Sequence, residues 1–163
     1  VLPAASQGTM NNVTLGGTDP RTARRFAYYE TVGGGMGGRP GLPGISGVHT
    51  HMSNTRNTPI ESLERSYPME IAEYRIRRGS GGGGSHRGGD GLVRRYRVLE
   101  RCTVTLVTER RARAPHGAMG GDDGAAGVNR LNGRPLPAKC RMELQPGDEV
   151  TIETPGGGGW GRA

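Results

Sequence analysis

The chain has 163 residues and a formal net charge of +7; glycine supplies 31 residues, and apolar types make up only 32%. This length suits one domain, and so few apolar residues predict a thin core that leans on other protein for stability. There is no Gly-X-Y period, which excludes collagen, and no stretch nears the roughly 20 apolar residues of a membrane-spanning helix.

Nearly all the positive charge is arginine, since Lys139 is the only lysine. Such a balance invites a nucleic-acid reading, but the arginines are scattered and the aromatic residues (4%) are too sparse for a base-stacking platform. We therefore expect no nucleic-acid partner, and arginines that form ion pairs at interfaces. Cys102 and Cys140 lack metal-ligand spacing, and no secretory signal is evident, so we expect reduced thiols in a cytoplasmic protein.

The predicted elements are mainly β-strands. Runs with apolar, aromatic or β-branched residues between turn signals predict strands over 10–15, 26–32, 69–77, 92–99, 102–108, 139–144 and 149–154. The first is expected to end at the Gly16-Gly17 pair. One short helix is predicted from Pro59 to about Arg65, because Pro68 prevents its continuation.

Turn residues suggest how the strands connect. The strands over 92–99 and 102–108 are expected to pair, as are 139–144 and 149–154, which flank Pro146-Gly147-Asp148. Asn132-Gly133 predicts a two-residue hairpin turn. The glycine clusters predict close backbone packing, and the lone Trp160 is expected to anchor the tail. The fold class is mainly β with one or two short helices, in a single glycine-rich and loop-rich domain over residues 1–163.

The stretch 48–61 holds the residues that we predict to carry chemistry. His49 and His51 are separated by one residue, so an extended backbone would point both imidazoles to one face. Two imidazoles there can bind a metal or place an acid beside a base. The spacing fixes no third ligand, so no metal site is predicted, and ordinary hydrogen-bonded histidines at a loop edge are the alternative.

Polar residues surround the two histidines. Arg56 can fork onto a carboxylate or phosphate, or tie the loop to a neighbour. Thr58, Pro59 and Glu61 form the pattern of a capping box, so the Glu61 carboxylate is expected to accept the backbone N–H of Thr58. The candidate substrate-binding residues, two of them from an amide-rich segment that would otherwise fill a turn, are Asn54, Arg56, Asn57, Asn11 and Asn12.

Several strings of residues resemble the hydantoinase B/oxoprolinase family. They run in order over almost the whole chain: AASQGTMNN (4–12), YYET (28–31), GGGMG (33–37), HTHMSNTRNTP (49–59), RGGDG (87–91), PGD (146–148) and TPGGGGWG (154–161). The resemblance implies that residues 1–163 are the C-terminal part, about a third, of a B-type subunit.

The resemblance also implies an activity. Family members open five-membered cyclic amides, such as 5-oxoproline or N-methylhydantoin, with ATP, and relatives carboxylate acetone or acetophenone. An A-type partner subunit handles ATP, which fits the absence of a G-x-x-x-x-G-K phosphate loop here. A divalent metal is used, with ligands in the N-terminal part of the carboxylase relatives' subunit. We therefore expect a hetero-oligomer, a small cyclic-amide substrate, and an isolated chain that is inactive and binds no cofactor.

A chemical role for the loop follows from this resemblance. Amide resonance makes direct attack by water slow, and phosphorylation of the carbonyl oxygen supplies a leaving group that must be held away from bulk water. His49 or His51 would move a proton, while Asn54, Arg56 and Asn57 hold an anionic intermediate. Two alternatives stay open: a non-catalytic interface domain that docks the A-type subunit, or part of a ketone carboxylase.

Overall fold

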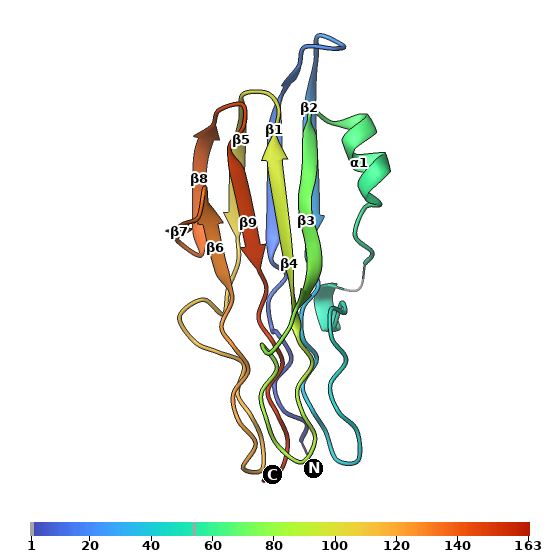
Figure 1. The fold of residues 1–163 in the computed structure, drawn as a ribbon, viewed down its shortest axis with the longest axis vertical. Helices are drawn as coiled ribbons and strands as arrows, with labels where there is room; N and C mark the ends of the chain where they lie inside the picture. Colours follow the sequence, from blue (N-terminus) through green and yellow to red (C-terminus); the bar gives the residue numbers. More distant parts are fainter. Residues whose placement is uncertain (1, 54) are drawn as a thin grey trace.

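The computed structural model describes residues 2–53 and 55–163, and within them two antiparallel sheets pack face to face (Figure 1). The first sheet contains, in spatial order, β2 (Arg24–Thr31), β1 (Asn12–Asp19), β5 (Cys102–Val107) and β8 (Lys139–Leu144). The second contains β3 (Met69–Arg77), β4 (Gly91–Val98), β9 (Glu149–Glu153), β6 (Val128–Leu131) and β7 (Arg134–Leu136). With the short helix α1 (Ile60–Ser66) and the 3-10 turn η1 (His51–Ser53), this confirms the predicted fold class.

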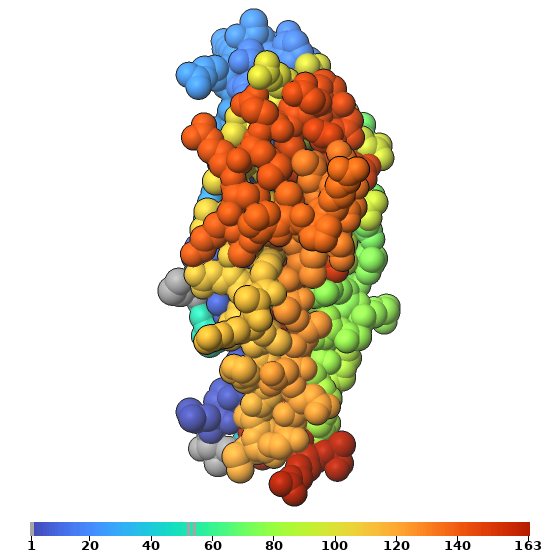
Figure 2. Space-filling view, turned by 90° about the vertical axis from the view of Figure 1, so that its left-hand side faces the viewer, coloured from blue at the N-terminus to red at the C-terminus, as the bar shows by residue number. Residues whose placement is uncertain are grey.

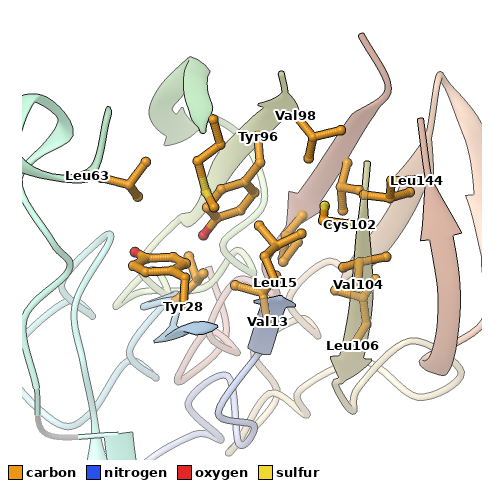
Figure 3. Packing of buried hydrophobic residues seen from close by; sticks show 14 of the residues in the cluster. Val13, Leu15, Tyr28, Leu63, Tyr96, Val98, Cys102, Val104, Leu106 and Leu144 are labelled. Carbon is orange, nitrogen blue, oxygen red and sulfur yellow. The ribbon is translucent and has the colours of Figure 1, made fainter. Parts of the chain in front are cut away.

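The core lies between the two sheets, where alternate residues of each strand point inwards (Figure 3). Helix α1 adds Leu63, which is fully buried and is worth roughly 1.5–3 kcal/mol relative to an exposed side chain. This helix closes one open side of the sandwich. The buried cluster includes Val13, Leu15, Tyr28, Tyr96, Val98, Val104, Leu106, Leu144, Val150 and Ile152.

The two predicted strand pairings are wrong. β4 pairs with β3 and β9, whereas β5 pairs with β1 and β8, so 92–99 and 102–108 belong to different sheets. The same holds for β8 and β9. The inward apolar faces of β4 and β5 meet across the core, so the chain crosses from one sheet to the other where a hairpin was expected.

Two local predictions have different outcomes. β1 does not end at Gly16-Gly17 but runs through both glycines, which pair with Ala27 and Phe26 of β2. The hairpin at Asn132-Gly133 is confirmed: it joins β6 to β7, and both turn residues have positive φ, 48° and 80°.

The glycine clusters pack against one another as predicted, in the lower half of Figure 1. The segment 156–159 runs among neighbouring extended segments and bonds to each: Gly38 N–H donates to the Gly158 carbonyl (2.8 Å), and Gly157 N–H donates to the Gly89 carbonyl (2.9 Å). Trp160 ends this segment, and its indole N–H donates to the Leu2 carbonyl at 3.2 Å, which confirms it as an anchor. The molecule is therefore elongated, with the sandwich at one end and backbone-on-backbone packing at the other (Figures 1 and 2).

Arginine forms ion pairs on the outer face of the second sheet. Arg97 contacts Glu149 at 2.7 Å and Glu70 at 3.4 Å, and Arg95 contacts Glu73 at 2.6 Å. Exposed pairs of this kind add little stability, but they neutralise much of the positive charge. These pairs lie within the chain, and the expectation that arginines form ion pairs at interfaces stays a prediction.

Cys102 should make stability depend on pH in alkaline solution. Burial raises the pKa of its thiol from 9.0 to about 11, because the thiolate is poorly solvated in the core. The folded chain keeps a proton that the unfolded chain releases, so this contribution is full below pH 9 and is lost as pH rises to 11. The free energy of unfolding is measured by urea titration at each pH. Between pH 9 and 11 it should fall less in Cys102→Ala than in the parent, by up to roughly 3 kcal/mol. Parallel pH profiles for the two proteins would contradict this assignment.

Candidate functional site

Residues 49–53 and 55–58 lie below α1 in Figure 1, on the side of the sandwich that carries the helix. β2 and β3 are the edge strands of the two sheets on that side. Helix α1 packs against β3, and the backbone N–H of Ile71 donates to the Glu64 carboxylate at 2.9 Å. The loop is therefore supported by both sheets and by the helix.

A buried ion pair fixes the end of this loop. Glu30 of β2 and Arg94 of β4 lie 2.8 Å apart, with side chains only 3% and 0% exposed. The Glu30 carboxylate accepts the N–H of Thr58 at 3.1 Å, and the Arg94 guanidinium donates to the Thr58 carbonyl at 3.3 Å. Both backbone polar groups of Thr58 are thus bound from the core.

Tyrosines complete the buried cluster. The Tyr96 hydroxyl donates to Glu30, and the Arg94 guanidinium lies over the Tyr74 ring, 4.4 Å from its centroid. Burial raises the pKa of Tyr96 well above its usual value and raises that of Tyr28 to about 12. Both phenols therefore stay protonated, and Tyr96 serves the Glu30 carboxylate as a neutral donor.

A second hydrogen-bonded group lies at the surface of the loop. The Asn57 side chain donates to the Thr31 carbonyl at 2.9 Å, and its oxygen accepts the Tyr74 hydroxyl at 3.1 Å. His49 Nε2 lies 3.2 Å from the same oxygen. Asn57 therefore joins β2, β3 and the start of the loop.

The loop borders three adjoining cavities. The first, about 380 Å³, is bordered by His51 and Asn12; the second, about 260 Å³, by Arg56 with Thr31 and the Glu30 side chain. The third, about 430 Å³, is bordered by His49, Arg56, Asn57 and Tyr74. The first two share Met10 and Ser53, and the last two share Thr55, Arg56 and Thr58. Together they form a groove that is mainly apolar in the first cavity and more polar in the third.

The two histidines do not share a face as an extended backbone would place them. His51 has a φ of +54° and begins η1, so the chain turns between them. His49 borders the third cavity, whereas the exposed His51 borders the first. The expectation of adjacent imidazoles is therefore wrong, because the turn separates them.

The predicted amides are divided between surface and interior. Asn12 borders the first cavity and accepts the Tyr29 hydroxyl at 3.0 Å. Asn11 is fully buried, with its amide donating to Gln7 at 2.7 Å and its oxygen accepting Arg111 at 2.6 Å. Asn54 lies outside the described residues.

The predicted capping box is wrong. Helix α1 has Pro59 at its N-cap, without a side-chain cap, and the Thr58 N–H is taken by Glu30, 28 residues earlier in the chain. A buried carboxylate fixed by Arg94 competes better for this N–H than the exposed Glu61. A glutamate does accept the Thr58 N–H, as predicted, but it is the distant Glu30 and not Glu61.

Sequence reasoning missed Glu30, Arg94 and Tyr74. A signal existed for one of them: adjacent residues of a strand point to opposite faces, so one of Arg94 and Arg95 had to face the core. An inward arginine in a sandwich requires a buried carboxylate partner. The sequence offers no means of choosing Glu30 among the carboxylates.

Two searches of the described residues gave no candidates. Among residues 2–53 and 55–163, no three His, Cys, Asp or Glu side chains are grouped to hold a metal ion. In the same part of the chain, no helix has the length and hydrophobicity to cross a membrane.

Comparisons with known proteins agree with the fold and the motifs. The model of the Hydantoinase B/oxoprolinase family matches residues 1–163. The chain is 40% identical to a 5-oxoprolinase of Dictyostelium discoideum over 164 residues, which are 98% of this chain and 12% of that protein. It resembles the crystal structure of an ATP-dependent caprolactamase from Pseudomonas jessenii, with a TM-score of 0.82 and 24% identity over 99% of this chain and 30% of that one.

A structure of acetone carboxylase is also similar, with a TM-score of 0.75 and 18% identity over 97% of this chain and 26% of that one. At these identities, the two structures show the fold alone. The chain spans less than a third of each of these three proteins. The match of the family model to every residue shows that the chain belongs to the hydantoinase B/oxoprolinase family.

Proposed function

We propose that this chain is one segment of a B-type subunit in an enzyme that opens cyclic amides with ATP, together with an A-type subunit. The observation that carries the proposal is the family match over residues 1–163, with a 5-oxoprolinase 40% identical over nearly the whole chain. The substrates that fit best are 5-oxoproline and N-methylhydantoin.

In this proposal Arg56 binds the anionic intermediate. Arg56 is exposed, it borders two of the three cavities, and it belongs to none of the ion pairs found among the described residues. Its guanidinium can therefore fork onto a phosphate or carboxylate. Asn57, next in the chain, lies beside it in the third cavity.

His51 is the better placed of the two histidines to move a proton. Its imidazole is exposed and borders the first cavity, which shares two residues with the second cavity, which Arg56 borders. A proton donor there can serve the amine that leaves as the ring opens. The groove is open in this chain, so the rest of the enzyme is proposed to close it and exclude water.

The test uses the full-length B-type polypeptide assembled with its A-type subunit. We expect ATP-dependent opening of 5-oxoproline to glutamate, or of N-methylhydantoin to the N-carbamoyl amino acid, with ADP formed, and a fall of about 100-fold or more in His51→Ala and Arg56→Ala. His116→Ala and Arg134→Ala, which change exposed residues away from the groove, are matched controls and should retain turnover.

Other outcomes select the alternatives. Normal turnover in both groove variants, with assembly intact, would contradict the proposed site and favour a non-catalytic interface domain. ATP-dependent carboxylation of acetone or acetophenone, without opening of cyclic amides, would favour a ketone carboxylase.

A further inference from the structure

We infer that His49 is a positioning residue that ties the base of the 50–56 loop through a hydrogen bond to Asn57 and takes no part in proton transfer. This inference rests on the proposed function, because the loop carries both His51 and Arg56. It divides the two histidines, which the sequence treats as a pair, into different roles.

The orientation of the Asn57 amide is fixed first. A carbonyl oxygen can only accept, so the nitrogen of the Asn57 amide is the atom that faces the Thr31 carbonyl at 2.9 Å. The amide oxygen then faces His49 Nε2 at 3.2 Å and the Tyr74 hydroxyl at 3.1 Å. Because this oxygen carries no hydrogen, both neighbours must donate to it.

The tautomer of His49 follows from this geometry. Of the two neutral tautomers, only the one with the hydrogen on Nε2 and the lone pair on Nδ1 can make this contact. Nδ1 is buried and has no hydrogen-bond partner among the described residues. The charged and titratable side chains that border this cavity are Arg56, Glu61 and Tyr74.

Both ends of the contact are held by the rest of the fold. Val48, just before His49, pairs with Gly34 through two backbone hydrogen bonds of 2.9 Å. Thr58, just after Asn57, is held by Glu30 and Arg94. The contact between His49 and Asn57 therefore closes a loop between two fixed stems.

Glutamine substitution separates a donor from a proton carrier. In the assembled full-length enzyme, His49→Gln can donate to Asn57 through its amide, whereas His49→Ala cannot. We expect His49→Ala to lower kcat/KM for cyclic-amide opening at least tenfold and His49→Gln to stay within about threefold of the parent. His51→Gln should lose turnover as fully as His51→Ala.

Hydrogen exchange measured by mass spectrometry on the same complexes gives a readout that does not need turnover. Peptides covering 50–56 should exchange faster in His49→Ala, at the parent rate in His51→Ala, and near the parent rate in His49→Gln. Equal loss of turnover in both His49 variants, with parent exchange in this segment, would overturn the inference. The expected exchange pattern without any cyclic-amide turnover would refute the proposed function and leave the structural tie supported.

Discussion

Replacing Gly157 with alanine should prevent the glycine-rich half of the molecule from forming. A Cβ at this position would overlap the carbonyl group of Met36 and lie 2.7 Å from the backbone nitrogen of Gly37. Gly157 cannot move aside, because its N–H donates to Gly89 and its carbonyl accepts from Gly82, each at 2.9 Å. The obstacle is backbone, so no rotamer change relieves it, and we expect a loss above about 4 kcal/mol.

Gly16→Ala is the matched control, because Gly16 lies within a strand and an added Cβ would come no closer than 3.5 Å, to the Phe26 carbonyl oxygen. Its effect should stay within about 1 kcal/mol, since alanine loses less backbone entropy on folding. The yield of folded protein and the thermal melting temperature decide between the two. A Gly157→Ala protein that melts with the parent would mean that the glycine segments do not pack as described.

The glycine clusters show how far the sequence could predict this fold. Their density between short strands indicated close packing, and the turn chemistry of Asn132-Gly133 located one hairpin correctly. The pairing of neighbouring strands could not be predicted. A short connection joins β4 to β5, and another joins β8 to β9, and each was expected to be a hairpin turn. A short connection fits a hairpin and a crossing between sheets equally well, and only the packing of the whole core decides.

The candidate site shows the same limit. The histidine-rich stretch was chosen from residue types alone, and its part in the chemistry stays a prediction; the structure shows that Arg56 and Asn57 border one cavity. The turn at His51 was not predictable, since a positive φ in a residue other than glycine depends on surrounding contacts. The buried pair beneath the loop was also missed, because Glu30 and Arg94 are 64 positions apart and meet only when the sheets stack.

That buried pair leads to the second large effect. Arg94→Met should destabilise the chain by roughly 3–5 kcal/mol, because it leaves the Glu30 carboxylate in the core with only the Tyr96 hydroxyl and the Thr58 N–H as partners. The double variant Glu30→Gln/Arg94→Met should recover much of this loss. The amide that replaces the Glu30 carboxylate is uncharged, and its oxygen can still accept the Thr58 N–H. Urea denaturation of the two variants and the parent measures the difference.

Arg97→Met provides the control on the same strand, since Arg97 faces the opposite side and its ion pairs with Glu149 and Glu70 are exposed. We expect only a small change in its denaturation midpoint, because solvent screens such pairs. If Arg97→Met and Arg94→Met lose equal stability, burial does not explain the contribution of the pair between Glu30 and Arg94 to stability. If the double variant is no more stable than Arg94→Met, the loss comes from packing around the arginine side chain and not from an isolated carboxylate. The loop that carries His51 and Arg56 would then be held mainly by the shape of the core beneath it.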